Sequence, residues 1–596
     1  MQLLEQYIRL CTGYPHNKYG SPVDISLAEV AEILCCTLRN ATLTLKKMQA
    51  KGWLTWQPGR GRGNRSVLVC AIRPADLVLS IAKEAVHQGE IRASRDLISQ
   101  YEAGIPQLAE DYARWMSSHF GIHAASETGR VDILRLFVDR PFDGLDPIHV
   151  LLRSQTHIVK HVFDTLVRFD PLTKRIEPHL VYDWETDSSR CEWTFYLRKG
   201  VLFHNGSKLR AEDVCYTLNR LKKEASSHRW MMQTVETVEA LGEHVVRIRL
   251  NRPNELFLDL LSKEYMSIVS RDFMEQASGS LVQMPVGTGA FRLVRNDDSM
   301  LALEAFEPYF RGRPFIDRIE FWCVPVMQAE EKQMVMPVTE EDSRLMERDS
   351  AWKSVVRLEK CFQYISFNAA KEGPLRNDAF RRKIASLIDP QKLCEDLQGS
   401  RERLGSWGFG FAFEHQPDDS KDAAAIAAQW RDRSYAGEVL KLYTYPDIDH
   451  IEDAEWIKER CASYGIAVEI VYAVPEELAR PEVMQQADMV LDSANVDERE
   501  EASLLELCFA NALSITHHIK PSVKAHVTQL IAQLQEETSV QERKQKVKGI
   551  IRELIEHQVF VPLYHNRVDM LAHPRLAHVH LDAYGWIDFS RLIFRH

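Results

Sequence analysis

Residues 193–221 of the chain are WTFYLRKGVLFHNGSKLRAEDVCYTLNRL. Apolar and polar side chains alternate over Trp193–Arg198, and Lys199-Gly200 then provides a turn before a second extended segment, Val201–Ser207. From Arg210 to Leu221 the apolar positions follow the helical period instead. This stretch therefore predicts a strand, a turn and a further extended segment, followed by a helix, as in a mixed α/β domain.

Three further stretches share a family signature with it. They are FDTLVRFDPLTKRIEPHLVYDWE at 163–185, PVGTGAFRL at 285–293, and a block with Phe367-Asn368, Pro374, Asp378, Arg382 and Asp389. Together they resemble the solute-binding proteins of the oligopeptide and nickel-uptake type, family 5, over roughly residues 133–595. The resemblance implies a two-lobed α/β domain of the periplasmic-binding-protein-like (type II) class over residues 131–596. It also implies hinge strands near 319–324 and 559–564, with the ligand between the lobes.

Most signature residues are expected to be scaffold. Asp213 stands where it would brace a helix start, and Gly287 and Gly289 allow tight backbone turns. Arg382 and Asp389 are expected to form structural ion pairs rather than ligand contacts.

One aromatic loop supplies the candidate ligand contacts. Trp407, Phe409 and Phe411 lie in the glycine-spaced stretch Ser406–Phe413. Small-molecule clefts combine aromatic walls with a few polar groups, and Asn368 is the polar candidate. The same aromatic side chains could instead pack in the interior, and both interpretations stay open.

The first 73 residues predict a different domain. Ser26 with Glu29 forms a capping-box pattern before the helix Leu27–Leu34, and Thr37 is the N-cap expected for a helix over Leu38–Ala50. Cys35-Cys36 would be the tight turn between the two helices. Two short helices joined in this way match a helix-turn-helix, whose second helix enters the major groove of DNA.

A β-hairpin is predicted to follow, with strands over Gly52–Gln57 and Ser66–Ile72 and the tip PGRGRGNR at 58–65. It would be the wing of a winged helix-turn-helix. The tip glycines do not form G-x-G-x-x-G before a helix, so they do not indicate a nucleotide-binding loop. The other interpretation is a solvated hairpin in a segment that mediates dimerisation.

Charge favours DNA as the partner of this segment. Residues 1–75 contain ten Lys or Arg and four Asp or Glu, whereas the whole chain carries a formal charge of −11. Arg39, Asn40 and Thr42 are the candidates for reading bases. The candidates for phosphate contacts are Lys46, Lys47, Arg60, Arg62 and Arg65.

The complete arrangement resembles the SgrR-type regulators of sugar-phosphate stress, and KGWLTWQPGRGRGNRS (Lys51–Ser66) nearly reproduces the motif of their head. Residues 74–130 are expected to form a helical connector, with a small, polar linker over 121–130. The resemblance implies a bacterial transcriptional regulator that binds double-stranded DNA. Its clamp would sense a small solute: a sugar, a sugar phosphate or an oligopeptide.

Several observations predict a cytoplasmic location for this regulator. The N-terminus shows no basic segment followed by an apolar core, and the apolar runs are far shorter than a membrane span. The eleven cysteines lack C-x-x-C spacing and suit a reducing compartment. We therefore expect no membrane association and leave a homodimer open. The alternative is a solute-binding protein that feeds an ABC importer for peptides or nickel.

No catalytic motif is present. The sequence lacks G-x-S-x-G, H-E-x-x-H and G-x-x-x-x-G-K-[ST], so we predict neither enzyme activity nor a cofactor. His157 and His161 are four apart on one predicted helix, but they lack obvious third and fourth ligands, so no metal site is predicted.

Overall fold

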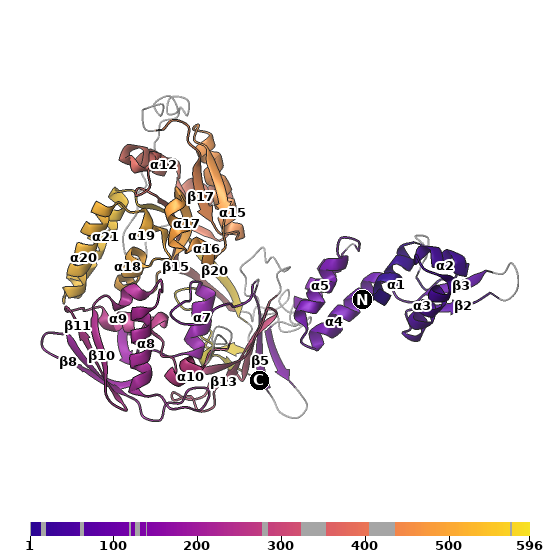
Figure 1. The fold of residues 1–596 in the computed structure, drawn as a ribbon, viewed down its shortest axis with the longest axis horizontal. Helices are drawn as coiled ribbons and strands as arrows, with labels where there is room; N and C mark the ends of the chain where they lie inside the picture. Colours follow the sequence, from indigo (N-terminus) through magenta and orange to yellow (C-terminus); the bar gives the residue numbers. More distant parts are fainter. Residues whose placement is uncertain are drawn as a thin grey trace.

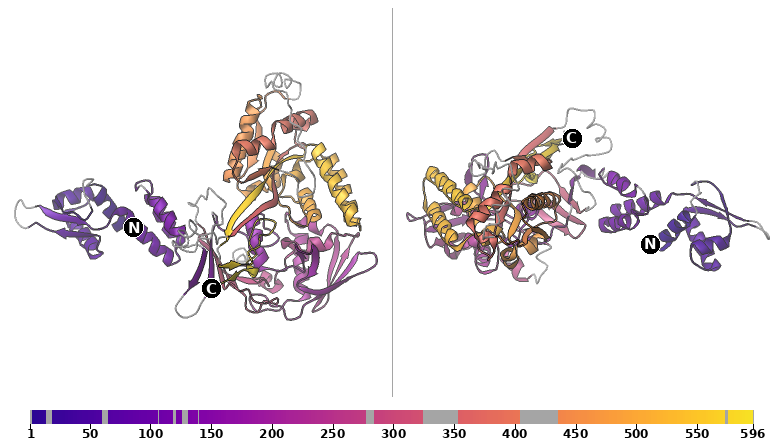
Figure 2. Two further views of the ribbon diagram at one scale, coloured as in Figure 1. Left: turned by 180° about the vertical axis from the view of Figure 1, so that it is seen from behind. Right: turned by 90° about the horizontal axis from the view of Figure 1, so that it is seen from above.

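The computed structural model describes residues 2–13, 19–59, 65–105, 107–117, 121–125, 131–138, 140–276, 284–323, 353–403, 435–572 and 575–595. Three parts follow one another along the chain (Figure 1): a head (residues 2–73), a set of helices (74–117) and a two-lobed body. The head projects from the body, and the helices join the two (Figure 2). Within the described residues, no helix is long and apolar enough to cross a bilayer.

The head is a winged helix-turn-helix. Ser26 and Glu29 form the predicted capping box, and Cys35 takes a positive φ of 50° in the turn. The hydroxyl of Tyr7 lies 2.9 Å and 2.6 Å from the backbone oxygens of Trp53 and Ile72, which ties the first helix to the sheet. Its elements are α1 (Gln2–Thr12), β1 (Val23–Ile25), α2 (Leu27–Ile33), α3 (Leu38–Ala50), β2 (Leu54–Gln57) and β3 (Ser66–Cys70), with strand order β1-β3-β2.

Helices α4 (Pro74–His87), α5 (Ile91–Tyr101) and α6 (Leu108–Ser117) follow the head. One continuous apolar cluster runs from the head through these helices to Met300 and Trp322 of the lower lobe. Arg295 donates a hydrogen bond to the backbone oxygen of Gly89, so polar contacts reinforce the junction. The head is thus connected to the body by packed side chains and not by the chain alone.

The linker expected over 121–130 is in part a strand. Residues 121–125 form β4, which pairs antiparallel with β5 (Val131–Val138) in a five-stranded sheet. The short, small sequence GIHAA has too little alternation to announce a strand, and its pairing with β5 supplies the order that its own pattern lacks.

The body has a lower and an upper lobe, named here by their places in Figure 1. The lower lobe contains two larger sheets. The five-stranded sheet has the order β12-β13-β14-β5-β4 and the four-stranded sheet the order β10-β11-β9-β8. Their remaining strands are β12 (Phe291–Asn296), β13 (Met300–Ala305), β14 (Arg318–Cys323), β10 (Val235–Gly242), β11 (Val245–Leu250), β9 (Glu192–Leu197) and β8 (Val181–Thr186). A small pair, β6 (Val167–Asp170) and β7 (Arg175–Pro178), lies beside them in sequence.

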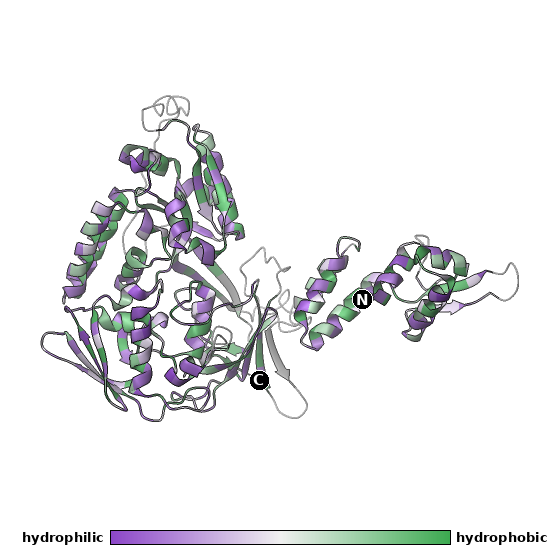
Figure 3. Cartoon of the chain, viewed as in Figure 1, coloured by the Kyte–Doolittle hydropathy of each residue, from purple (hydrophilic) through white to green (hydrophobic). Residues whose placement is uncertain are grey.

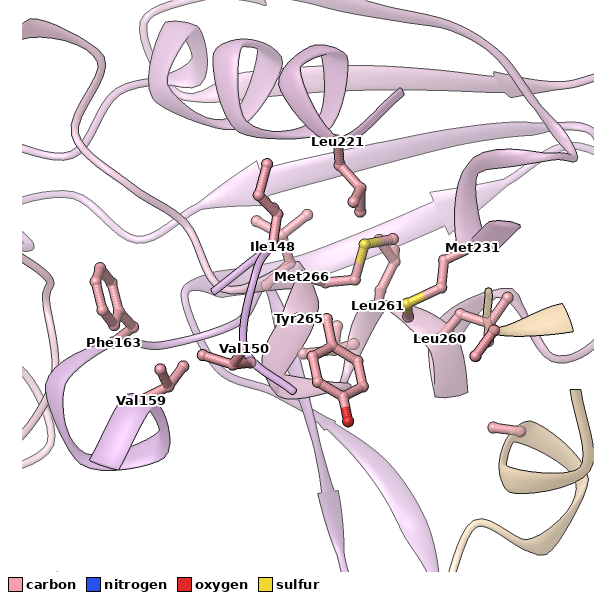
Figure 4. Close-up of a cluster of buried hydrophobic side chains, with 14 of the residues drawn as sticks. Ile148, Val150, Val159, Phe163, Leu221, Met231, Leu260, Leu261, Tyr265 and Met266 are labelled. Carbon is pink, nitrogen blue, oxygen red and sulfur yellow. The ribbon is translucent and has the colours of Figure 1, made fainter. Parts of the chain in front are cut away.

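Helices α7 (Arg153–Val162), α8 (Ala211–Lys223) and α9 (Phe257–Leu261) contribute to the core of this lobe. Asp213 accepts a hydrogen bond from the backbone N–H of Arg210 and braces the start of α8. Figure 4 shows Leu221, Met231 and Met266 in the core, with the hydroxyl of Tyr265 directed out of the cluster.

The upper lobe is built on a six-stranded sheet of order β16-β20-β15-β19-β17-β18. The strands are β16 (Arg401–Arg403), β20 (Phe560–Ala572), β15 (Lys353–Phe367), β19 (Met489–Ala494), β17 (Leu440–Thr444) and β18 (Val468–Tyr472). Its helices include α12 (Asp378–Leu387), α13 (Pro390–Leu397), α15 (Ile448–Ala462), α18 (Glu500–Phe509), α20 (Pro521–Glu536) and α21 (Val540–Glu556). Hydrophobic and hydrophilic residues alternate along α20 and α21, as in amphipathic helices (Figure 3).

The ion pairs expected for Arg382 and Asp389 are not what the structure shows. The Asp389 carboxylate accepts hydrogen bonds from the backbone N–H groups of Gln391 and Lys392 and so caps α13. Arg382 is exposed and forms no ion pair with a described residue, whereas its neighbour Arg381 is buried. The phase of α12 decides this difference, since only one of two adjacent arginines can face the core.

The expected hinge segments lie inside sheets. Residues 319–323 belong to β14, while Val324 lies outside the described residues, and Phe560–Tyr564 pair with β15 in the upper sheet. Strands β15 and β20 continue their pairing beyond this region, over Lys353–Leu358 and Arg567–Ala572. This part forms a ribbon from the upper lobe towards the lower one (Figures 1 and 2).

Candidate functional site

The second helix of the helix-turn-helix, α3, presents a basic outer face. Thr37 caps the helix by accepting a hydrogen bond from the backbone N–H of Asn40. Arg39 and Lys46 are exposed on one side of α3, opposite the buried Leu45 and Met48. Since the head projects from the body, a long ligand could reach this face (Figure 1).

Within the described residues, no carboxylate neutralises the charges on this face. Arg39, Lys46 and Lys47 are exposed and form no ion pair in the part of the chain that the structure describes. Asn40 is exposed beside Arg39. Thr42 differs, because its side chain is half-buried and its hydroxyl donates a hydrogen bond to the backbone oxygen of Leu38. The arrangement therefore brings Arg39, Asn40, Lys46 and Lys47 to the surface together.

Leu43 was not among the sequence candidates, yet it belongs to the same surface. Its side chain is 50% exposed, and it lies four residues after Arg39 and four before Lys47. An exposed leucine on a basic helix face can make apolar contact with a thymine methyl group. The sequence signal was an apolar residue out of phase with the buried positions Ala41, Leu45 and Met48.

The wing is described at its base only. Arg60 and Arg62 lie outside the described residues. Arg65 is exposed, and its guanidinium lies 2.7 Å from the Glu29 carboxylate at the start of α2. The backbone N–H of Gly59 donates to the Ser66 hydroxyl across the base of the hairpin. The base is thus held against the helix-turn-helix.

Between the lobes lies a buried ionic network. Lys263, which follows α9 in the lower lobe, places its Nζ 2.9 Å from Oδ2 of Asp497 and 3.5 Å from Oε2 of Glu506. Arg499 donates to the backbone oxygen of Ser262 at 2.7 Å. Asp497 follows β19 of the upper sheet, so these contacts join the two lobes. Protein side chains fill the seam at this point.

The network shifts the protonation of its carboxylates in opposite directions. Burial alone would raise the pKa of Asp497, but the Arg499 and Lys263 cations outweigh it and hold that pKa well below its usual range. Burial also raises the pKa of Glu506, and there Lys263 does not compensate fully. The hydroxyl of Tyr265 donates to Glu506 at 3.0 Å. Asp497 is therefore the fixed anion of the seam.

Of the sequence candidates for ligand contact, the structure describes only Asn368. Trp407, Phe409 and Phe411 lie outside the described residues. Asn368 is buried, and its amide donates to the backbone oxygens of Gln485 and Ala487 while its oxygen accepts two backbone N–H groups. These four hydrogen bonds give Asn368 a structural role, because they leave its amide no capacity for a ligand.

The PVGTGAFRL signature has a packing explanation. A Cβ atom on Gly287 would lie 2.0 Å from the backbone oxygen of Val162, and one on Gly289 would lie 2.4 Å from that of His161. Thr288 between them donates its hydroxyl to Asp164. The motif thus lets the loop approach the end of α7 more closely than any other residue could.

His157 and His161 pack in an aromatic environment. Their rings lie 4.8 Å apart, and His157 stacks on Trp586 while His161 contacts Phe589. Burial lowers the pKa of His161 to about 4. Among the described residues, no group of three or more potential ligands is placed to hold a metal. The pair therefore acts as part of the core between α7 and the C-terminal segment.

Comparison with known protein families gives one match in the N-terminal part of the chain and one in the body. The model of bacterial extracellular solute-binding proteins, family 5 Middle, matches residues 175–512, more than half of the chain. The model of the sugar transport-related sRNA regulator N-terminal domain matches residues 2–119. The first match covers parts of both lobes, and the second covers the head and the helices α4–α6.

Relatives extend over the full length. YhjP of Bacillus subtilis is 33% identical over 99% of both chains. The HTH-type transcriptional regulator SgrR of Yersinia enterocolitica is 26% identical, and the alignment covers 100% of this chain and 98% of SgrR.

Solved structures share the fold of the body. DppA of Helicobacter pylori, in complex with the peptide STSA, matches with a TM-score of 0.65 at 19% identity, over 78% of this chain and 98% of its own. NikZ of Campylobacter jejuni, in complex with Ni(L-His), matches with a TM-score of 0.61 at 17% identity, over 77% and 99%. The chain therefore belongs to the family 5 bacterial extracellular solute-binding proteins and, with the regulator domain in front of them, to the SgrR-type regulators.

Proposed function

We propose that this regulator binds double-stranded DNA through α3 and the wing and that its two-lobed body senses a small solute. The observation that carries the proposal is the exposed, unpaired basic face of α3 on a projecting head. Arginine suits the guanine edge and asparagine the adenine edge in the major groove, so Arg39 and Asn40 would select sequence. Leu43 would add an apolar contact between them.

The remaining cations would supply affinity without sequence choice. Lys46, Lys47 and Arg65, together with the wing residues Arg60 and Arg62, would contact phosphates and release counterions. Binding would therefore weaken steeply as salt rises. If the protein binds as a dimer, the selected DNA would contain two half-sites at about one helical turn or a multiple of it.

Solute sensing would act on the seam between the lobes. A ligand changes a conformational equilibrium only when it binds the two states unequally. A sugar, sugar phosphate or oligopeptide that entered the seam would compete with the contacts around Lys263 and Asp497. The packed helices α4–α6 would carry the resulting change to the head, since they share one apolar cluster with both parts.

The experiment that tests this function starts from selection. Full-length protein is mixed with a random DNA library, the retained fragments are sequenced, and a mobility shift is then measured with and without candidate solutes. Enrichment of one sequence, with a shift that responds to a solute, supports the proposal. Retention of all fragments alike would refute sequence-specific binding.

The competing function is cargo delivery to an importer, and it predicts a different location. Cell fractionation separates the two, because a DNA-binding regulator must be found in the cytoplasm. Recovery of the protein outside the plasma membrane would favour the importer function.

A further inference from the structure

A cavity of about 510 Å³ opens on the lower lobe at the end of β7. Its lining comes from three separate segments of the chain. The lining residues are Glu177, Pro178, Arg198, Phe310 and Arg311. None of them belongs to the ionic network between the lobes or to the head, so the cavity is distinct from both sites described above.

Positive charge at this cavity exceeds negative charge. Arg168, on β6, pairs with Glu177 at 3.3 Å. Arg198 and Arg311 have no carboxylate partner among the residues that the structure describes. Burial and repulsion from Arg168 and Arg198 lower the pKa of Arg311, and the attraction of Glu177 does not offset them.

The guanidinium groups are held in place by other contacts. Asp164 accepts a hydrogen bond from Nε2 of His179 at 2.6 Å, and Nδ1 of His179 then accepts from Arg311 at 3.3 Å. Arg198 donates its Nε to the backbone oxygen of the same histidine at 2.7 Å. Both arginines are thus oriented by His179, while the two terminal nitrogens of Arg198 keep their donors unused within the described residues.

An aromatic ring forms one side of the cavity. The ring of Phe310 packs edge-on against His179 at 5.3 Å and gives the cavity an apolar wall.

We propose that this cavity binds a small molecule through a phosphate or similar oxyanion group, with Phe310 contacting its apolar part. Guanidinium forks match the geometry of such anions, and charge-assisted hydrogen bonds to them are among the stronger ones in proteins. The cavity is also in the size range of small-molecule sites. This inference does not depend on DNA binding by the head.

Isothermal titration calorimetry of the full chain tests it, with phenyl phosphate, inorganic phosphate and phenol as probes at constant ionic strength. Phenyl phosphate should saturate a site that phenol does not fill. Equal affinity for inorganic phosphate would identify the free anion as the occupant, and stronger binding of phenyl phosphate would identify an organic phosphate.

Matched variants locate the site. The variants Arg311→Ala and Arg198→Ala should each lower the affinity for phenyl phosphate about tenfold or more. Arg210→Ala removes an exposed arginine of the same lobe, paired with Glu243, and should change affinity less than about twofold. If Arg311→Ala does not fold, Arg311→Lys keeps the charge without the fork and should still bind more weakly. Two results would overturn the proposal. One is unchanged binding by these cavity variants, which would place the anion elsewhere, and the other is the absence of saturable heat with the wild-type protein.

Discussion

Lys263 and Asp497 are 234 residues apart in the chain, and their side chains form a 2.9 Å ion pair at the seam of the two lobes. Their side chains are only 1% and 4% exposed. Because the pair is this deeply buried, salt and water weaken its attraction little. Neither charge is hydrated, so each is stabilised by nearby protein groups instead of by water. Lobe closure in this protein therefore includes a buried ionic contact supplied by the chain itself.

Removing one member of this pair should destabilise the body strongly. Lys263→Met leaves Glu506 without its cation and Asp497 with Arg499 alone, and we expect a loss of about 3–5 kcal/mol in the free energy of unfolding. Urea denaturation followed by fluorescence measures it. The control is Lys458→Met, which breaks an exposed pair with Glu455 and should cost about 1 kcal/mol or less. Equal losses in the two variants would contradict the role of Lys263.

The signature glycines make a second prediction. Gly289→Ala would place a Cβ 2.4 Å from the backbone oxygen of His161, and backbone cannot move aside as a side chain can. We expect a loss of about 1–3 kcal/mol or more. Gly242→Ala is the matched control, because a Cβ there meets nothing within 4 Å. Thermal unfolding of both variants decides, and a stable Gly289→Ala protein would refute the close approach.

His204 predicts a pH dependence. Its Nδ1 accepts the backbone N–H of Gly287 and its Nε2 donates to the backbone oxygen of Gly289, which fixes the neutral ring. Burial lowers its pKa to about 4, from an ordinary value of 6.5. The unfolded chain therefore binds a proton that the folded chain refuses between these pH values. This contribution to stability is complete above pH 6.5 and is lost as the pH falls to 4.

The variant His204→Gln can keep both hydrogen bonds but cannot titrate. The free energy of unfolding should then fall less steeply from pH 6.5 to 4, by at most about 1.4 kcal/mol per pH unit. Buried His161 and His228, with pKa values also lowered to about 4, maintain part of the slope in both proteins. An identical slope in wild type and variant would show that His204 does not titrate as described.

Phosphate contacts make a prediction about salt. Lys46→Ala combined with Lys47→Ala should lower the slope of log affinity against log salt by about 2, while the preferred DNA sequence is retained. Fluorescence anisotropy at several salt concentrations measures the slope. Lys174→Ala, in a turn of the lower lobe, should leave it unchanged. A change of preferred sequence in the double variant would assign base contacts to these lysines instead.

Local signals in the sequence were enough for the head. The Ser26–Glu29 capping box and the Thr37 cap each act within three residues, so helix starts could be predicted without knowledge of the fold. The two-lobed body followed from signature stretches such as 285–293. Their glycines lie against the backbone at the end of α7, where a Cβ atom would not fit.

Contacts between distant segments could not be predicted in this way. Nothing near Lys263 indicates that Asp497 is its partner, since only the packing of two lobes brings them together. Asp389 has the sequence of a helix cap as well as of an ion-pair member, and the fold selected the cap. Asn368 stands in a family motif, but its hydrogen bonds hold a turn. A polar residue with a structural role and one that contacts a ligand look alike in sequence.

The most direct test of DNA recognition by α3 is fluorescence anisotropy on the selected fragment and on a scrambled fragment of the same composition. Wild-type protein should prefer the selected fragment, and Arg39→Ala with Asn40→Ala should lose about 1–3 kcal/mol of discrimination per base contact while binding both fragments similarly. If the double variant discriminates as well as wild type does, α3 is not the recognition helix of this protein.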